Sequence, residues 1–187
     1  MNVAGEFRQR DVHRSGHFRL SSGKHSDTYL QCALALQDPG FAVALGEALA
    51  DRLRSEQPDL AVDVVASPAL GGVLAGFVVA RALGARFVFT ERHEGQMTLR
   101  RGQHVATSER VLVVEDVVTT GGSAQEAADV VEAEGGVIVG YAAIVDRSES
   151  FPVTALLRVE AQTWDPEECP LCAEGDPLDH PGSRPTR

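Results

Sequence analysis

Two acidic residues followed closely by hydroxyl residues and glycines form the stretch of this chain best suited to chemistry. Residues 111–123 read VLVVEDVVTTGGS, with Glu115 and Asp116 after four apolar residues. Glycines let successive backbone N–H groups point into one concavity, hydroxyls add donors, and the N-terminus of a following helix adds free N–H groups. This pattern predicts an anion site, and phosphate is the expected ligand.

The acid pair would repel a phosphate unless it contacts another part of the ligand. Carboxylates accept hydrogen bonds from the vicinal hydroxyls of a ribose, as the acidic residue of dinucleotide sites does. The order of acids, hydroxyls and glycines therefore predicts a ribose 5-phosphate site. The alternative is an ordinary strand-to-helix turn with a Thr or Ser cap and a solvated acid pair. The stretch has no GKS, GKT or GxGxxG sequence, so it is neither a Walker nor a Rossmann motif.

All thirteen positions of this stretch resemble the phosphoribosyl-pyrophosphate motif of the type I phosphoribosyltransferases. The resemblance implies an α/β fold with a central, mainly parallel sheet flanked by helices, and a small hood formed by the N- and C-terminal parts. It also implies that the motif residues bind phosphoribosyl pyrophosphate; these are Glu115, Asp116, Val117, Val118, Thr119, Thr120, Gly121, Gly122 and Ser123. The motif does not identify the acceptor base.

The elements that position this motif follow from the apolar pattern. Residues 111–114 are too few for a helix and suit a strand buried on both faces, and residues 124–134 look helical up to Gly135-Gly136. Earlier in the chain, Asp38-Pro39 begins a helix with a 3.6-residue apolar period, and residues 62–65 form the first core strand. Further strands are expected at residues 87–89 and 137–145.

Length and composition favour one globular domain. The chain has 187 residues, 43% of them hydrophobic, and a formal net charge of −10. We expect a hood at residues 6–37, a core at 60–147 with a lid at 90–107, and a tail at 166–187. The acidic balance disfavours nucleic-acid and anionic-membrane partners, and no signal-peptide core is visible. A cytoplasmic protein is expected, and the sparse cysteines, Cys32, Cys169 and Cys172, fit a reducing compartment.

The N-terminal part contains a second informative stretch, in which alternating residues predict a hairpin that turns at Ser22-Gly23. It resembles the hood of the orotate phosphoribosyltransferases, which closes over the pyrimidine, and the resemblance implies that Tyr29 contacts orotate. The chain departs from that pattern at Ser21, where many members have lysine, and at Leu30, where an aromatic residue is usual. Lys24 and His25 are substitutes for the base contact or parts of a solvated turn. The matching residues are Gly16, Phe18, Leu20, Ser22, Gly23, Ser26 and Tyr29.

The loop after the first core strand, residues 67–72, contains Gly71 and Gly72. It resembles the pyrophosphate-binding loop of the same family, which often contains a non-proline cis peptide. Many members have a lysine at the position of Gly71, so contacts to pyrophosphate are expected from backbone donors. A simple strand-to-helix loop is the alternative.

Residues 90–107 form a polar interval with cations and histidines, as expected for a mobile loop over an anionic substrate. In the family this lid reaches into the neighbouring subunit's site, which implies a homodimer. Arg92, Arg100 and Arg101 are the candidates for pyrophosphate contact, because arginine can clamp phosphate oxygens, and His104 stands behind them. We expect Arg100 and Arg101 to act in catalysis with Glu115 and Asp116. A solvated basic loop is the alternative.

Asp146-Arg147 ends the strand expected at residues 137–145, at the sheet edge that carries the acid pair. In orotate phosphoribosyltransferases an arginine in this setting pairs with the carboxylate of the base. The resemblance therefore implies that Arg147 and Thr119 contact orotate. A salt bridge at the end of the strand is the alternative for Arg147.

The tail contains one CxxC sequence, Cys169-Pro170-Leu171-Cys172. A single CxxC supplies half of a tetrahedral zinc site, and no second one follows. His180 and Cys32 could complete such a site only by folding or dimer symmetry, so we expect no metal held by protein ligands. Mg²⁺ is expected to be held mainly by substrate oxygens and water. The CPLC and PGSR segments resemble the C-terminus of short bacterial orotate phosphoribosyltransferases.

These resemblances together imply transfer of 5-phosphoribosyl from phosphoribosyl pyrophosphate to orotate, giving orotidine 5'-monophosphate and pyrophosphate in pyrimidine biosynthesis. Two alternatives remain within the same fold. One is a purine or uracil phosphoribosyltransferase, which the hood and Arg147 disfavour. The other is a regulator that senses phosphoribosyl pyrophosphate and binds nucleic acid, which would need a basic face or an added helix-turn-helix domain.

Overall fold

The computed structural model describes residues 1–20 and 22–181, which fall into two compact units. The core unit contains Met1 and residues 35–159, and the hood unit contains residues 2–34 together with the chain from residue 160. The limits expected from the sequence were residues 37 and 166. Ser21 and all of the PGSR segment after Pro181 lie outside the described residues.

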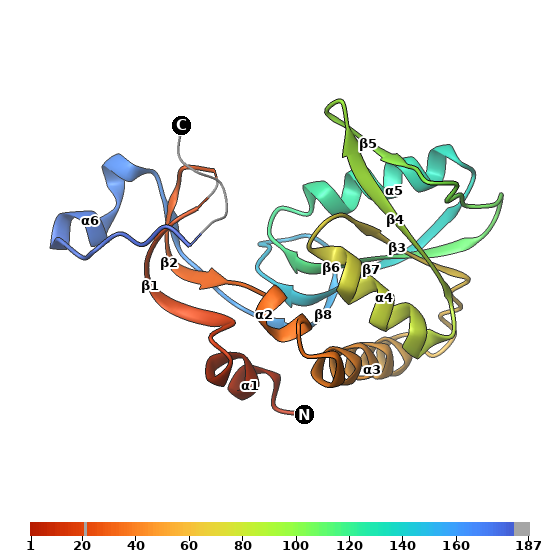
Figure 1. Ribbon diagram of the computed structural model, residues 1–187, viewed down its shortest axis with the longest axis horizontal. Coiled ribbons are helices and arrows are strands. Elements are labelled where there is room, and N and C mark those ends of the chain that lie inside the picture. Colours follow the sequence, from red (N-terminus) through yellow and green to blue (C-terminus); the bar gives the residue numbers. More distant parts are fainter. Residues whose placement is uncertain (21, 182–187) are drawn as a thin grey trace. The chain divides into compact units, whose positions relative to one another are not determined.

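A six-stranded sheet forms the centre of the core unit (Figure 1). Its strand order is β5-β4-β3-β6-β7-β8, and every neighbouring pair is parallel except the antiparallel pair β4 and β5. The mainly parallel α/β fold implied by the sequence is therefore confirmed. The strands are β3 (Val64–Pro68), β4 (Arg86–His93), β5 (Gln96–Leu99), β6 (Arg110–Val118), β7 (Val137–Asp146) and β8 (Thr154–Arg158).

Three long helices cover this sheet: α3 (Pro39–Glu56), α4 (Gly72–Leu83) and α5 (Gly122–Ala133). The helix α4 connects β3 to β4, and α5 connects β6 to β7 in the opposite direction along the sheet. Because such crossovers are right-handed, the two helices lie on opposite faces. The predicted start of α3 is confirmed, since the Asp38 side chain accepts hydrogen bonds from the backbone N–H groups of Gly40 and Phe41, at 3.1 and 3.2 Å.

The central strands are buried on both faces, as the apolar runs predicted. All of β3 is buried, and so are residues 111–115 of β6. Burying one such valine contributes about 1.5–3 kcal/mol, so the strands that end at the acid pair are firmly held. One cluster between the sheet and α5 contains Val64, Ala66, Val88, Val105, Val111 and Val131.

The interval at residues 90–107 was expected to be a loop, but part of it is a hairpin. The prediction of a loop throughout was therefore wrong. Strand β4 continues to His93, and β5 pairs with it in an antiparallel register that matches His93 with Gln96. The turn between them has positive φ angles at Glu94 (51°) and Gly95 (85°), as the favoured two-residue hairpin turn requires. The rest of the interval, from Arg100 to Thr107, is irregular.

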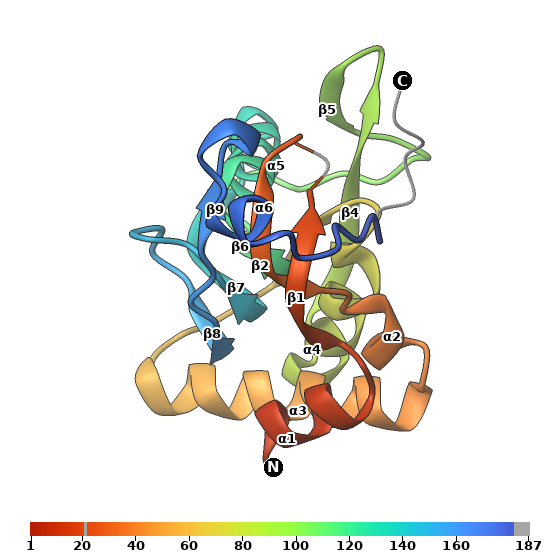
Figure 2. The same ribbon diagram turned by 90° about the vertical axis from the view of Figure 1, so that its left-hand side faces the viewer.

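The hood unit contains a second sheet, in the order β1-β2-β9, whose neighbouring strands are all antiparallel. Figure 2 shows β1, β2 and β9 side by side, with α6 following β9 along the chain. The predicted hairpin is confirmed, with Arg19 opposite His25. The elements of this unit are α1 (Val3–Gln9), β1 (His13–Arg19), β2 (His25–Leu30), β9 (Thr163–Trp164), the 3₁₀ helix η1 (Pro166–Glu168) and α6 (Pro170–Glu174), and the short α2 (Ala33–Leu36) leads into the core unit.

None of the helices within residues 1–20 and 22–181 combines the length and apolar character needed to cross a membrane.

Candidate active site

A cavity lies where β6 ends and α5 begins, and it is lined by residues of the acid, hydroxyl and glycine motif. Its volume is about 250 Å³ with the open mouth included, and polar groups make up most of its lining. The backbone of Gly121 is left-handed, with φ 80°, and the N–H of Gly122 donates to Thr120 Oγ1 at 3.3 Å. The lining residues are Glu115, Val117, Val118, Thr119, Thr120, Gly121, Gly122, Ser123 and Ala124. The residues predicted to bind the phosphate, 119–123, thus line one cavity, and phosphate binding there stays a prediction.

Phe151 supports the cradle from outside the motif. A Cβ atom added to Gly121 would collide with the Phe151 ring, so this ring packs directly on the glycine backbone. Phe151 also makes an edge-on contact with Tyr141, with ring centroids 4.8 Å apart. Gly121 is therefore required twice, for its positive φ and for the close approach of Phe151. Phe151 could not be predicted from the sequence, because it lies 30 residues from Gly121 in an irregular segment.

The acid pair and the Gly71-Gly72 loop meet at the end of the sheet. A Cβ atom on Gly71 would lie 2.8 Å from Asp116 Oδ1, and one on Gly72 would lie 2.8 Å from Glu115 Oε2. Only backbone fits so close to these carboxylates. The peptide bond between Ala69 and Leu70 is cis, as the resemblance implied. The loop and the acid pair therefore belong to one site.

The two carboxyl groups of the acid pair are held in a state that disfavours their charge. Burial, together with the nearby Asp116, raises the pKa of Glu115 to about 8. Burial also raises the pKa of Asp116 above its ordinary value. A ligand that brings hydroxyl donors or developing positive charge would favour the ionised forms, whereas a second anion would not.

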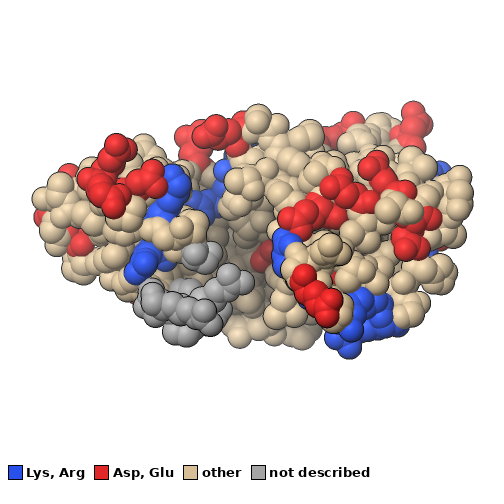
Figure 3. Space-filling model, turned by 90° about the horizontal axis from the view of Figure 1, so that it is seen from above, with Lys and Arg blue, Asp and Glu red and all other residues tan. Residues whose placement is uncertain are grey.

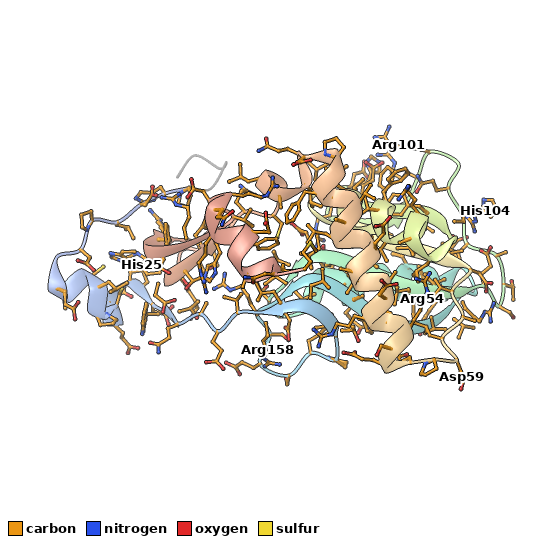
Figure 4. All side chains as sticks on the ribbon, turned by 90° about the horizontal axis from the view of Figure 1, so that it is seen from below. His25, Arg54, Asp59, Arg101, His104 and Arg158 are labelled. Carbon is orange, nitrogen blue, oxygen red and sulfur yellow. The ribbon has the colours of Figure 1, made fainter. Side chains whose placement is uncertain are left out.

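The arginines expected in the lid contact acidic side chains in this structure. Arg92 forms an ion pair with Glu126 of α5, with 2.6 Å between Nη2 and Oε2. Arg100 and Arg101 both pair with Glu91, at 3.6 and 3.2 Å. His104 is exposed and points away from the sheet (Figure 4). None of these residues lines the described cavity, so the structure does not bring them together with the acid pair.

Arg147 follows β7 at the same end of the sheet as the acid pair, and its backbone N–H donates to the carbonyl oxygen of Val118 at 2.8 Å. The neighbouring Asp146 is buried and accepts from the N–H and the Oγ of Ser148, at 2.7 and 2.6 Å. Asp146 also pairs with Arg158, labelled in Figure 4, at 3.3 Å. A salt bridge at the strand end thus exists, made by Arg158 with Asp146.

Tyr29 belongs to the hood unit, so its contact with a base stays a prediction. Its hydroxyl donates to the carbonyl oxygen of Pro181 at 3.4 Å and accepts from Gln31 Nε2 at 3.3 Å. Its ring packs near that of Phe18, with centroids 5.7 Å apart. These contacts fix the ring within the hood sheet.

Comparison with known proteins supports this arrangement. The model of the phosphoribosyl transferase domain family matches residues 34–154. The chain is 50% identical over 183 residues to an orotate phosphoribosyltransferase of Heliobacterium modesticaldum, covering 95% of each protein. It is 46% identical over 183 residues to that of Caldanaerobacter subterraneus subsp. tengcongensis, covering 95% of this chain and 94% of that protein.

A solved structure agrees with these sequence relatives. It is the orotate phosphoribosyltransferase of Mycobacterium tuberculosis H37Rv in complex with phosphoribosyl pyrophosphate, with 28% identity and a TM-score of 0.60. The match covers 83% of this chain and 93% of that chain. The resemblance found in the sequence is therefore confirmed, and the chain belongs to the orotate phosphoribosyltransferases within the phosphoribosyltransferase family.

Proposed function

We propose that this chain carries out its family's reaction at the cavity between β6 and α5. The substrates are phosphoribosyl pyrophosphate and orotate, and the products are orotidine 5'-monophosphate and pyrophosphate. One observation carries the proposal: Glu115 lines the same cavity as residues 119–123, and the carboxylates of Glu115 and Asp116 lie against the backbone of the Gly71-Gly72 loop. Ligands of open α/β sheets bind at this end of the strands.

Each part of the site meets a different part of the donor substrate. The 5-phosphate lies on residues 119–123, where backbone N–H groups, hydroxyls and the start of α5 favour an anion. The ribose hydroxyls lie on Glu115 and Asp116, and the pyrophosphate lies against the backbone of Gly71 and Gly72. The ribose hydroxyls thereby replace water as hydrogen-bond donors to the acid pair.

Bond breakage at C1 of the ribose leaves an oxocarbenium-like centre, while pyrophosphate departs with the bonding electrons. Preorganised charge near that centre stabilises the transition state more than the ground state. Glu115 and Asp116 supply this negative charge, and their raised pKa values fall as positive charge develops beside them. The ring nitrogen of orotate loses its N–H proton to water and forms the new bond to C1 from the opposite face, so the enzyme mainly positions its substrates.

Mg²⁺ is the proposed cofactor. The residues that line the cavity offer carboxylate, hydroxyl and backbone oxygens and no imidazole or thiol, a set that suits a hard cation. When bound, Mg²⁺ would neutralise charge on the pyrophosphate and would be held mainly by substrate oxygens and water. Glu115 and Asp116 remain assigned to the ribose.

For orotate, we assign Arg147 to the carboxylate of the base, with Thr119 and Tyr29 as further contacts. Thr119 lines the cavity, and Arg147 follows the strand beside it. We expect Arg147→Ala to raise the KM for orotate at least 10-fold, with little change in affinity for phosphoribosyl pyrophosphate. Steady-state kinetics and a binding titration check this, and equal losses for both substrates would refute the assignment.

A homodimer that shares the lid is the proposed assembly, with Arg92, Arg100 and Arg101 able to serve the partner's site. Such a role would require these arginines to leave Glu126 and Glu91. Sedimentation measures the assembly. Mixing two inactive variants, Arg101→Ala and Asp116→Asn, would restore part of the activity if the lid acts across subunits.

The surface charge fits a small-molecule substrate better than a nucleic-acid partner. Acidic side chains cover more of the face shown in Figure 3 than basic ones do, and the formal net charge is −10. Nucleic-acid binding draws most of its affinity from a basic surface.

The experiment that tests the proposed function follows the absorbance of orotate after mixing protein, Mg²⁺ and phosphoribosyl pyrophosphate. Uracil and hypoxanthine run in parallel. We expect orotate to be consumed selectively. Turnover of uracil or hypoxanthine instead would refute the substrate, and binding of phosphoribosyl pyrophosphate without turnover of any base would favour a regulator.

A further inference from the structure

Four side chains of the hood unit converge on one point. They are His17 of β1, His25 of β2, and Cys169 and Cys172 at the beginning of α6. One ring nitrogen from each histidine and both sulfur atoms all lie within 4.8 Å of one another. Figure 4 labels His25, which lies on the hairpin beside the C-terminal segment. No part of the proposed function uses this group.

The distances in the group match those between the ligands of one metal ion. His17 Nε2 and His25 Nδ1 are 3.0 Å apart. Cys169 Sγ lies 3.4 Å from His17 Nε2, and Cys172 Sγ lies 3.6 Å from His17 Nε2 and 3.3 Å from His25 Nδ1. Tetrahedral zinc, with Zn–N about 2.05 Å and Zn–S about 2.3 Å, separates two nitrogens by about 3.3 Å and a nitrogen from a sulfur by about 3.6 Å.

The surroundings of the group orient its lone pairs inward. His17 Nδ1 lies 3.0 Å from the carbonyl oxygen of Asp176 and donates to it, which leaves Nε2 as an acceptor that faces the group. Metal-bound histidines are usually held by such a bond from the other ring nitrogen. His17, His25 and Cys169 are at most 5% exposed, while Cys172 is exposed and offers an entry path.

We propose that His17, His25, Cys169 and Cys172 bind one Zn²⁺ ion in a closed, tetrahedral, structural site. Two thiolates and two imidazoles are a common ligand set for structural zinc, and four protein ligands leave no position for a substrate. The site is independent of the proposed function, because it would hold the hood together whichever base the enzyme used.

The ion would connect two parts of the chain that are far apart in sequence. His17 and Cys169 are separated by 152 positions, so a metal here fastens the C-terminal segment to the N-terminal hairpin. Pairing of β2 with β9 and an ion pair between Arg14 and Asp179 also join these two segments, but the apolar core of the hood unit is small. Among its described residues, the buried apolar side chains are Val3, Phe7, Val12, Phe18, Cys32 and Cys169. Small units with few buried side chains often depend on a metal or disulfides.

This group also corrects two expectations drawn from the sequence. The CxxC was recognised as half of a zinc site, but Cys32 and His180 were considered as its completion, and neither belongs to the group. His25 was assigned to a solvated turn or a base contact, yet it is 5% exposed and contacts His17 and Cys172. The other two ligands are His17 and His25, which the hairpin brings to the two cysteines when it folds against the tail.

The test begins with tag-free full-length protein, purified without chelators from cells grown with zinc. Elemental analysis should find one zinc per chain. Replacement of the bound zinc by Co²⁺ should give the intense visible bands of tetrahedral cobalt bound by thiolates. Adding Zn²⁺ back should displace the cobalt and remove these bands. Wild-type protein with less than a tenth of a zinc per chain and no cobalt bands would overturn the proposal, as would a Cys169–Cys172 disulfide in freshly purified protein.

Matched variants separate the ligands from their neighbours. Cys172→Ser and His17→Ala should lower zinc content at least 10-fold, whereas Cys32→Ser and His180→Ala should leave one zinc per chain. Retention of zinc by both ligand variants would overturn the assignment. If the ligand variants do not fold, the metal content and cobalt spectrum of the wild-type protein decide the question alone.

Discussion

The phosphate cradle and the proposed zinc site are built in opposite ways. The cradle and the acid pair both come from the nine consecutive residues 115–123 at one strand-to-helix junction, so their chemistry can be predicted from the order of residue types along the chain. The zinc ligands come from two strands and a short helix, with 152 positions between His17 and Cys169. A contiguous motif reveals its ligand from the order of residue types, whereas a dispersed site becomes visible only after folding.

The two sites also differ in what holds them. The cradle rests on a parallel sheet buried on both faces, and its acid pair is kept at raised pKa values by that burial. The zinc site lies in a unit with few buried apolar side chains, where the metal itself would supply stability. We therefore expect damage to the cradle to affect function first, and damage to the zinc site to affect stability first.

The largest effect is expected from Gly121→Ala. A residue with a Cβ costs about 1–2 kcal/mol in the left-handed conformation, and here it also collides with Phe151. We expect affinity for phosphoribosyl pyrophosphate to fall by about 100-fold, or ~3 kcal/mol, since the start of α5 must shift. Isothermal titration measures this loss.

Gly84→Ala is the matched control for that substitution. Gly84 also has a left-handed backbone, with φ 72°, but a Cβ there would meet no atom within 4 Å. The Gly84→Ala variant should lose stability because of a similar backbone strain, and it should keep its affinity for phosphoribosyl pyrophosphate. If both variants lost affinity equally, strain alone and not the cradle would explain the result.

Glu115→Gln should stabilise the ligand-free protein at alkaline pH while it reduces activity. The pKa of Glu115 in the folded state is about 8, above its ordinary value of 4.5, so the unfolded chain ionises first as pH rises. Ionised Glu115 destabilises the folded wild-type protein. This destabilisation is absent below pH ~4.5, grows between pH ~4.5 and ~8, and above that reaches its full value, on the order of 2–4 kcal/mol. Thermal unfolding at pH 5 and pH 8.5 measures the difference.

The control for this prediction is Glu132→Gln, which replaces an exposed acid on α5. It should change the free energy of unfolding by less than about 0.5 kcal/mol at either pH. A Glu115→Gln variant with the same stability gain at both pH values would contradict the assigned burial effect.

Removal of zinc is expected to have the smallest effect on substrate binding. Chelation should lower the midpoint of thermal unfolding by more than about 5 °C, because a stabilising ligand of the folded state is lost. Affinity for phosphoribosyl pyrophosphate should change less than twofold, since the cradle belongs to the core unit. A proportional loss of both would show that the two sites are not independent.

Much of the core could be predicted because its signals are local. The buried run of β6, the glycines before α5 and the Asp38 cap each act on adjacent residues. The hairpin of β4 and β5 was missed because its turn, Glu94-Gly95, lacks the commoner Asn-Gly or Asp-Gly sequence. Strand β8 was missed because it pairs in parallel with β7 although residues 147–153 between them contain no helix.

The residues that complete each site were the hardest to predict. Phe151 and His25 act through contacts across the fold, and nothing in their neighbours along the chain marks them. The lid arginines show the reverse case, because their types suggested a substrate but the structure pairs them with Glu91 and Glu126. Residue type suggests chemistry, and only the fold decides which partner is within reach.

We assign both the phosphate cradle and the ribose contacts to one contiguous motif, residues 115–123. Titration of ribose 5-phosphate and of inorganic phosphate into wild-type protein and Asp116→Asn separates these two roles. We expect the variant to bind ribose 5-phosphate about 10-fold more weakly and inorganic phosphate as well as the wild type does, because we assign Asp116 to the sugar and not to the phosphate. Equal affinity of both proteins for ribose 5-phosphate would contradict the assignment of the acid pair to the ribose.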